Sequence, residues 1–284
     1  MPTLYVVATP IGNLNDFSPR GIETLKNADM IAAEDTRVTM KLCNKFDIHT
    51  RLISCHQHNE NEKGPWLAQK MLDEDLTVAL TTDAGTPCIS DPGYALIREC
   101  VERGINVIPV PGCCAAVTAL SVCGMDTREF SFYGFLPRDK KECSAKVMEI
   151  SKHTRIAVIH ESPFRITETL GWISDLLPET EAAVCSDLTK IHEKVFRGKL
   201  PDIVETLKND PKAEKGEYCI VLQFPEYREE KKENSVPDLS PEAAIVELMK
   251  DGKSLREAQE ILIEKGMKKN LIKQAAIDLK KLFQ

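Results

Sequence analysis

The loop formed by residues 81–93 (TTDAGTPCISDPG) carries the residue types best suited to holding a small ligand. Gly85 and Gly93 allow the backbone to approach a ligand closely or to adopt positive φ. Asp83 and Asp91 place two carboxylates at the mouth of the loop, where they would repel an anion and hold a cationic or hydroxyl-rich molecule. A capped connection between a strand and a helix uses the same residue types, but thirteen residues exceed the about 2 to 6 of an ordinary crossover. We therefore predict a binding loop for a small molecule other than a nucleoside polyphosphate.

Charged side chains also follow a second predicted strand, residues 30–33. Glu34, Asp35 and Arg37 come directly after it. This position faces the crevice of an open α/β sheet, where ligands bind. A solvated helix start capped by Thr36 is the alternative interpretation.

A third polar group, residues 56–63 (HQHNENEK), follows a predicted strand at residues 52–55. Its imidazole, amide and carboxylate groups suit contact with a ribose or a base edge, or a role as general base. A plain polar loop is the competing interpretation. A metal site is disfavoured, because no third ligand follows His56 and His58 at a suitable spacing.

Strands are needed to position these groups, and apolar segments alternate with helical ones throughout residues 1–112. The predicted strands are residues 4–8, 30–33, 52–55, 77–81 and 106–110. This alternation predicts an α/β domain with a parallel sheet and with binding loops at the strand ends.

The pattern changes after residue 112 and predicts a second α/β domain over residues 113–224. A helix is expected over residues 113–123, and strands are expected over residues 130–133, 156–160, 182–186 and 217–224. Their less regular order favours a mixed sheet.

The remaining segments predict a linker and a small helical domain. Residues 225–239 are polar without apolar periodicity, which indicates a solvated linker. Over residues 240–284, Ser240 precedes a helix, Ser254 and Glu257 form a capping box, and Leu271 and Leu279 mark a last helix. Residues 265–284 hold six Lys and one Asp, so this tail contacts RNA phosphate or is simply a solvated helix.

Composition narrows the class of protein. The net charge of -7 argues against nucleic-acid binding over the whole surface, so RNA would need a local basic patch. The start lacks the features of a signal peptide and no apolar run is long enough to span a membrane, which makes the cytoplasm the expected location. The ten cysteines form no Cys-x-x-Cys pair and are expected to be core thiols rather than metal ligands.

Several motifs occur together in a specific order. They are residues 9–14 (TPIGNL), 33–37 (AEDTR), 58–60 (HNE), 83–87 (DAGTP), 89–93 (ISDPG), 134–137 (GFLP), 161–163 (ESP) and 188–190 (LTK). With them the chain resembles the ribosomal RNA small subunit methyltransferase I family of the tetrapyrrole-methylase superfamily, from about Leu4 to Phe224. The resemblance implies two α/β domains with a cofactor cleft between them, S-adenosylmethionine as cofactor, no metal, and a homodimer. It also implies the 2′-hydroxyl of a decoding-centre cytidine of 16S rRNA, in the small ribosomal subunit, as methyl acceptor.

The same resemblance implies a set of site residues. Those bordering the cofactor would be Pro10, Asp83, Ala84, Gly85, Ile89, Ser90, Asp91, Cys113, Ala115, Ala116, Tyr133, Phe135, Leu136, Leu188 and Glu217. Those facing the nucleotide would be Asp35, Arg37, His58, Asn59 and Arg165. Glu34 or Glu161 would accept the hydroxyl proton, since both follow strands, and Lys190 would orient the ribose or phosphate.

The chain departs from the family pattern at three places. The family has Ser-Ala where this chain has Cys113-Cys114-Ala115, His where it has Phe164, and Arg-Glu where it has Ser186-Asp187. The change at Cys113 replaces one small residue by another and should spare cofactor binding.

Three other functions remain to be weighed against rRNA methylation. A related methyltransferase with a different acceptor is disfavoured by residues 34–37 and 188–190. A nicotinamide-dependent oxidoreductase is disfavoured because no Gly-x-Gly-x-x-Gly follows the first strand. A non-catalytic RNA-binding ribosome factor would make use of the basic tail.

Overall fold

The computed structural model describes residues 1–225, 239–264 and 267–282. The chain divides into two compact units, Met1–Tyr227 and Arg228–Gln284. The predicted linker, residues 225–239, lies almost wholly outside the described residues. No helix in the described part of the chain has both the length and the apolarity to cross a membrane.

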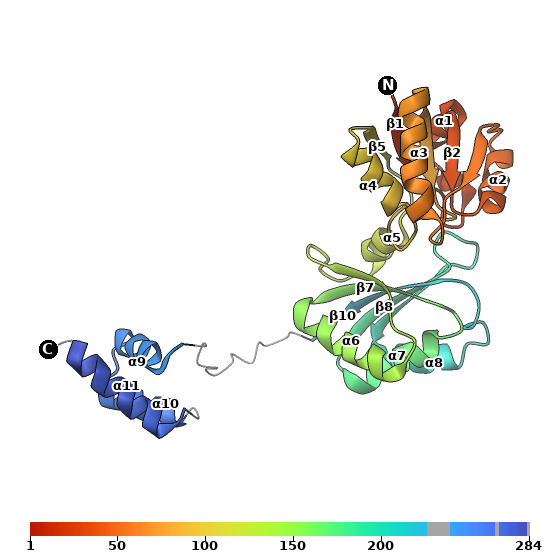
Figure 1. Cartoon of the computed structure of the whole chain (residues 1–284). Coiled ribbons are helices and arrows are strands. Elements are labelled where there is room, and N and C mark those ends of the chain that lie inside the picture. The colour runs from red at the N-terminus through yellow and green to blue at the C-terminus, as the bar shows by residue number, and fades with distance from the viewer. Residues whose placement is uncertain (226–238, 265–266, 283–284) are drawn as a thin grey trace. The chain divides into compact units, whose positions relative to one another are not determined.

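The first sheet has five parallel strands in the order β3-β2-β4-β1-β5, which confirms the prediction from strand and helix alternation (Figure 1). Its strands are β1 (Thr3–Val7), β2 (Met30–Ala33), β3 (Arg51–Ser54), β4 (Thr77–Thr81) and β5 (Asn106–Val110). The helices around it are the 3₁₀ helix η1 (Leu14–Asp16), α1 (Pro19–Asn27), α2 (Thr36–Lys45), α3 (Glu60–Glu74) and α4 (Tyr94–Glu102). Because all strands run the same way, the loops after β1, β2 and β4 meet at one edge.

Side-chain alternation buries both faces of this sheet. In β2, Met30 and Ala32 pack with α3 and α4, whereas Ile31 and Ala33 pack with α1 and α2. A sheet covered on both sides is the usual state of parallel strands.

The second sheet has the order β6-β7-β10-β8-β9 and is mixed, as predicted. Only β6 and β7 are parallel, and the other neighbours are antiparallel. Its strands are β6 (Ser131–Phe135), β7 (Ile156–Glu161), β8 (Glu181–Ser186), β9 (Lys194–Lys199) and β10 (Tyr218–Gln223), and its helices are α5 (Ala115–Val122), α6 (Lys140–His153), α7 (Ile166–Leu176) and α8 (Leu200–Lys208).

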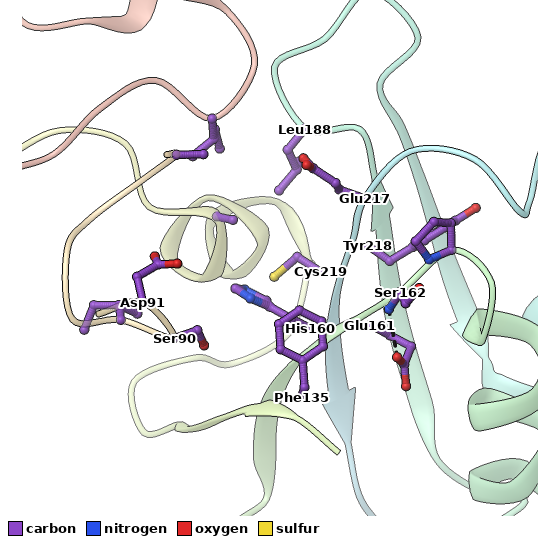
Figure 2. Close-up of a pocket in the computed structure, with 15 residues that line it drawn as sticks. Ser90, Asp91, Phe135, His160, Glu161, Ser162, Leu188, Glu217, Tyr218 and Cys219 are labelled. Carbon is purple, nitrogen blue, oxygen red and sulfur yellow. Dashed lines mark hydrogen bonds between the residues drawn. The ribbon is translucent and has the colours of Figure 1, made fainter. Parts of the chain in front are cut away.

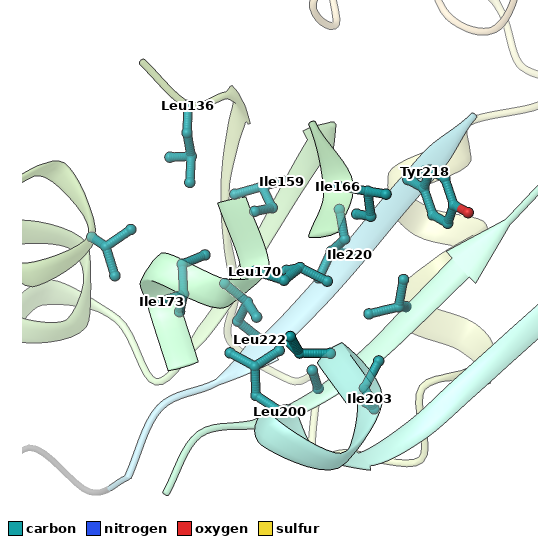
Figure 3. Packing of buried hydrophobic residues seen from close by; sticks show 14 of the residues in the cluster. Leu136, Ile159, Ile166, Leu170, Ile173, Leu200, Ile203, Tyr218, Ile220 and Leu222 are labelled. Carbon is teal, nitrogen blue, oxygen red and sulfur yellow. The ribbon is translucent and has the colours of Figure 1, made fainter. Parts of the chain in front are cut away.

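The two faces of the second sheet are covered differently. Three helices, α6, α7 and α8, bury one face, where Leu170, Ile173 and Leu222 belong to the largest core cluster (Figure 3). The short helix α5 covers the other face. Both sheets belong to one compact unit, while the boundary near residue 112 stays a prediction.

Three elements of the second sheet and its helices were not predicted, namely α6, β9 and α8. Helix α6 begins at a basic segment and depends on Asp139, which accepts hydrogen bonds from the backbone N–H groups of Lys141 and Glu142. Strand β9 is at the sheet edge and largely exposed. Helix α8 follows it directly.

Some local expectations were wrong. Asp35, and not Thr36, caps α2. Helix α3 begins at Glu60, inside the segment that could also have been a polar loop. Leu72 of α3 and Val101 of α4 are 40% and 62% exposed, because each lies just beside the buried stripe of its helix.

The ten cysteine thiols are all free, and seven are buried. This confirms the assignment as core residues for these seven, whereas Cys88, Cys113 and Cys114 are only partly buried. No group of three or more His, Cys, Asp or Glu among the described residues could hold a metal ion.

The second unit contains three helices, α9 (Pro241–Lys250), α10 (Leu255–Glu264) and α11 (Lys269–Leu282). Ser240 caps α9. Ser254 and Glu257 exchange hydrogen bonds, which confirms the predicted capping box. The helices share a core that includes Ile245, Leu262 and Ile272.

Leu170 offers a test of the second core. It is fully buried in α7, whereas Leu176 in the same helix is 39% exposed. We expect Leu170→Ala to lower the free energy of unfolding by about 2–5 kcal/mol through transfer and cavity terms, and Leu176→Ala by less than about 1 kcal/mol. Urea unfolding of both variants measures the difference, and equal losses would contradict this packing.

Candidate functional site

A cavity of about 370 Å³ lies where loops of the two sheets meet. Its wall comes from the loops after β1 and β4, from α5, and from β6, β7 and β10 (Figure 2). The lining residues are Ile11, Ala84, Ile89, Ser90, Asp91, Ala115, Phe135, His160, Glu161, Ser162, Pro163, Leu188, Glu217, Tyr218 and Cys219. Its size falls within the about 300–1,000 Å³ of small-molecule pockets.

A β-bulge in β6 shapes one wall. The pairing of β6 with β7 shifts between Phe132 and Gly134, and Gly134 has φ +62°. Residues three apart on a regular strand face opposite sides, but the bulge lets Phe132 and Phe135 both reach the His160 ring, at centroid distances of 5.2 and 5.8 Å. Tyr133 and Leu136 instead pack in the core under the helices.

Alternation along β7 separates two adjacent residues. Glu161 faces the same side as Ile159, under α7, where its carboxylate accepts hydrogen bonds from the Thr169 hydroxyl (2.7 Å) and the Ser162 N–H (2.7 Å). The Glu161 side chain is fully buried, and Arg165 pairs with it at 3.4 Å. Glu161 therefore borders the cavity while its carboxylate holds the turn after β7.

His160 points the other way, into the cavity (Figure 2). Burial lowers the pKa of His160, and Glu217 only partly offsets this, so the imidazole is neutral at pH 7. Its Nε2 atom is buried without a hydrogen-bond partner among the described residues. A buried polar atom without a partner is costly, so a ligand that fills the cavity has a hydrogen-bonding group to satisfy at this wall.

The loop after β4 has a strained backbone. Cys88 and Ser90 have φ of 68° and 67°, a conformation that costs a non-glycine residue about 1–3 kcal/mol. Gly85, with φ +86°, does not line the cavity, because its backbone pairs with Thr9: Thr9 N–H donates to Gly85 O (2.8 Å) and Gly85 N–H to Thr9 O (3.1 Å). The loop is thereby anchored to the β1 loop, and Ile89, Ser90 and Asp91 face the cavity.

Carboxylates gather where β2 and β4 end. The Asp83 N–H donates to Glu34 Oε2 (3.2 Å), and the Asp35 N–H donates to Asp83 Oδ1 (3.1 Å). Burial raises the pKa of Glu34 and of Asp83. The side-chain hydrogen bond from Arg37 instead lowers the pKa of Asp35 to about 2.

Asp91 is the acid of this group that lines the cavity. Burial raises its pKa to about 7, and the charges of Glu34 and Asp83 act in the same direction. The cavity thus presents a carboxyl group whose ionisation a cationic ligand would favour.

A rigid turn closes the other side. Lys190 Nζ binds Asp187 Oδ1 (2.9 Å) and Glu217 Oε2 (3.1 Å). Burial works against its charge, yet these hydrogen bonds outweigh it and raise the pKa of Lys190. Leu188 of this turn faces the cavity, while Lys190 lies outside it.

Some of the residues predicted to border the cofactor line the cavity, and others lie outside it. Eight line the cavity: Ala84, Ile89, Ser90, Asp91, Ala115, Phe135, Leu188 and Glu217. Pro10 and Asp83 line a smaller neighbouring pocket, and Ala116 is buried in the core. The Cys113 carbonyl accepts a hydrogen bond from the Thr86 hydroxyl (3.0 Å) and supports the loop from behind.

The residues predicted to face the nucleotide are spread out. Arg37 is 87% exposed and paired with Asp35. His58 is exposed, and Asn59 Oδ1 accepts the His56 N–H at the start of α3. Arg165 donates to the Pro137 carbonyl (2.9 Å) and so belongs to the turn that Glu161 holds.

Six lining residues were not predicted: Ile11, His160, Ser162, Pro163, Tyr218 and Cys219. Three of them were within reach of the sequence, because Ile11, Ser162 and Pro163 belong to motifs already singled out. His160 shares its strand face with Val158, which packs against α5, but the sequence does not reveal which face carries the cavity.

The chain is similar to known methyltransferases over most of its length. Residues 3–204 match the model for tetrapyrrole (corrin/porphyrin) methylases. The chain is 42% identical over 269 residues to ribosomal RNA small subunit methyltransferase I of Halalkalibacterium halodurans, covering 94% of this chain and 92% of that protein. It is 38% identical over 278 residues to the protein of the same name from Escherichia coli O157:H7, covering 97% and 94%.

Solved structures share the fold at lower identity. Diphthine synthase aligns with a TM-score of 0.60 and 14% identity, covering 78% of this chain and 90% of that one. Uroporphyrin-III C-methyltransferase from Thermus thermophilus, complexed with S-adenosyl homocysteine, aligns with a TM-score of 0.53 and 14% identity, covering 78% and 97%. These similarities confirm the predicted two-sheet α/β architecture.

The raised pKa of Asp91 predicts a pH-dependent stability. The folded state keeps the Asp91 proton up to about pH 7, whereas the unfolded chain releases it near pH 4. The wild-type free energy of unfolding should therefore fall between about pH 4 and pH 7 relative to that of Asp91→Asn.

Above pH 7 we expect Asp91→Asn to be the more stable protein by roughly 2 kcal/mol, a value discounted for partial exposure. Below pH 4 the difference should vanish. Denaturant unfolding at pH 4, 6 and 8 measures it, and a pH-independent difference would contradict a protonated Asp91.

Proposed function

Because the chain belongs to the ribosomal RNA small subunit methyltransferase I family of tetrapyrrole methylases, we propose that it methylates 16S rRNA in the small ribosomal subunit. S-adenosylmethionine is the methyl donor, and the 2′-hydroxyl of a decoding-centre cytidine is the acceptor. The observation that carries this proposal is the identity to relatives of that name over nearly the whole chain. We extend the proposal to a homodimer, which the family resemblance implies, and to action in the cytoplasm, the location expected from the sequence.

The cavity fits such a donor. Its volume of about 370 Å³ is matched to a nucleoside with an amino-acid side arm, and its wall combines apolar side chains with a few polar groups. Asp91 lies there to offset a positive charge, and the unpartnered His160 ring lies there to accept or donate a hydrogen bond. An anionic dinucleotide would meet the carboxylates of Asp91 and Glu217 and suits the cavity less well.

S-adenosylmethionine supplies an activated methyl group together with its own leaving group, so the chain mainly has to position the acceptor. The strained loop after β4 and the turn at Leu188 form fixed walls on opposite sides of the cavity. Positioning of this kind contributes up to roughly 7–11 kcal/mol to lowering a barrier, compared with about 3–5 kcal/mol for a general base.

Glu34 is the better of the two predicted proton acceptors. Its carboxylate is at the acidic edge beside Asp91, is only partly buried, and has a pKa that burial raises. The Glu161 carboxylate is occupied by the Thr169 hydroxyl, the Ser162 N–H and Arg165. We assign proton acceptance to Glu34 and a positioning role to Glu161.

Two measurements test the proposed function directly. Isothermal titration should detect binding of S-adenosylmethionine and no binding of NADH. Mapping of 2′-O-methylation in 16S rRNA should show one cytidine losing its methyl group when the gene is deleted and regaining it when the gene is restored. An unchanged methylation pattern would refute the proposal.

The two glutamates should respond differently to removal of their charge. We expect Glu34→Gln to lower kcat by about 10²–10⁴-fold while S-adenosylmethionine affinity stays within about twofold of wild type, since the proton acceptor acts on the acceptor and not on the donor. Glu161→Gln should instead destabilise the fold by about 1–3 kcal/mol, because Arg165 loses its carboxylate partner. Methyl incorporation into assembled small subunits and thermal unfolding separate the roles; the reverse pattern would exchange them.

A further inference from the structure

A second hollow continues the cavity on the side away from the acids. It measures about 780 Å³ and is lined by residues 12–15, by Lys45 of α2, and by Asp187 and residues 189–192. Ile11 and Leu188 line the cavity, whereas the residues that follow them in the sequence, Gly12 and Thr189, line this hollow. We call it the outer groove; it begins where the cavity wall ends.

The two loops that form the outer groove are fixed to each other. The Asn13 N–H donates to the Thr189 hydroxyl (3.1 Å). Lys190 packs over Gly12, where an added Cβ would lie 2.7 Å from Lys190 Cγ. Both loops therefore move as one wall.

Residues 187–193 form a strained turn. Asp187 and Thr189 have φ of 52° and 68°, and a β-branched residue is rarely found there. The Glu193 carboxylate accepts the Thr189 N–H (2.5 Å), and the Lys190 ion pairs with Asp187 and Glu217 hold the turn from behind. Strain that several contacts maintain, beside a cavity, favours function over stability as the reason for this geometry.

This rigid turn presents an apolar side chain to solvent. Ile191 is 98% exposed, and Leu14 across the groove is 41% exposed. Exposed aliphatic side chains on rigid supports are used by nucleic-acid-binding proteins as wedges that separate stacked bases. A base taken out of its stack would find an apolar surface here.

The outer groove carries lysines, whereas the opposite side of the cavity carries carboxylates. Glu34, Asp83 and Asp91 make that side repulsive to phosphate. Among the residues that line the groove, Lys45 and Lys190 outnumber the one acid, Asp187, which pairs with Lys190. Lys45 and His192 are exposed there and form no ion pair among the described residues, so the donors left for an anion are theirs.

We infer that the outer groove holds the RNA strand beside the acceptor nucleotide, with Ile191 packed against an unstacked base and Lys45 and His192 at its phosphate. This inference rests on the proposed function and adds the path by which single-stranded RNA reaches the donor cavity. It moves the RNA contact away from Asp35, Arg37 and His58.

The test uses two substitutions with matched controls. Ile191→Ser removes the wedge, and Val101→Ser, at a residue 62% exposed on α4, is its control. Lys45→Glu reverses a charge in the last turn of α2, and Lys26→Glu does the same in the last turn of α1. All four proteins are measured for S-adenosylmethionine affinity by titration and for kcat/KM of methyl transfer to assembled small subunits.

We expect Ile191→Ser to lower kcat/KM at least about tenfold, the scale of one lost base contact. Lys45→Glu should lower it and reduce the slope of log(kcat/KM) against log[salt] by about one. Donor affinity should be unchanged in all variants, and both controls should match wild type.

Wild-type kcat/KM and salt slope in both groove variants, with donor bound normally, would overturn the groove and leave the methyltransferase standing. A wild-type protein that binds no donor or methylates no rRNA would remove the proposed function, and the groove with it. A photocrosslinker placed at residue 191 gives an independent readout: crosslinks to rRNA next to the methylated nucleotide support the groove, and their absence opposes it.

Discussion

The cavity depends on the two-residue period of side chains along β7 and β10. Because adjacent residues face opposite sides, Ile159 and Glu161 enter the core under α6, α7 and α8, while His160 enters the cavity. Cys219 lies opposite His160 in the β7–β10 register and follows it to the cavity side. A shift of the register by one residue would bury His160 and expose Ile159, so the large core also fixes the wall of the site.

The second sheet forms one wall of the cavity, and two loops with strained backbones form the others. In the part of the chain that the structure describes, six non-glycine residues have positive φ, and four of them, Cys88, Ser90, Asp187 and Thr189, lie in the two loops on either side of the cavity. Each loop is tied to the β1 loop, by the Thr9–Gly85 bridge on one side and the Asn13–Thr189 hydrogen bond on the other. The loop after β1 therefore contacts both walls of the cavity and fixes their positions.

The sequence predicts the parts of this site that depend on local pattern. All strands except the exposed edge strand β9, the parallel and mixed character of the two sheets, and the loop after β4 follow from apolar runs and from turn residues. Glu161 and His160 could not be assigned from the sequence. Both follow the same apolar run, and the packing of α5 and α7 on opposite faces of the sheet decides which side chain points into the cavity. The bulge at Gly134 is a similar case, because it redirects Phe135 towards the cavity and Tyr133 away from it.

The charges differ between the two sides of the cavity: acids gather on the side where β2 and β4 end, and lysines line the outer groove. On the proposed function, Asp91 in the cavity lining offsets the charge of a cationic donor, and Glu34 and Asp83 beside it make that side unfavourable for a polyphosphate backbone. On the proposed function, an acidic protein binds RNA at a local site where lysines outnumber acids, and the lining of the outer groove, with Lys45 and Lys190 against Asp187, is such a site. On the proposed function, the donor occupies the cavity beside Asp91 and the RNA strand lies in the outer groove, so the distribution of charge separates the two binding regions.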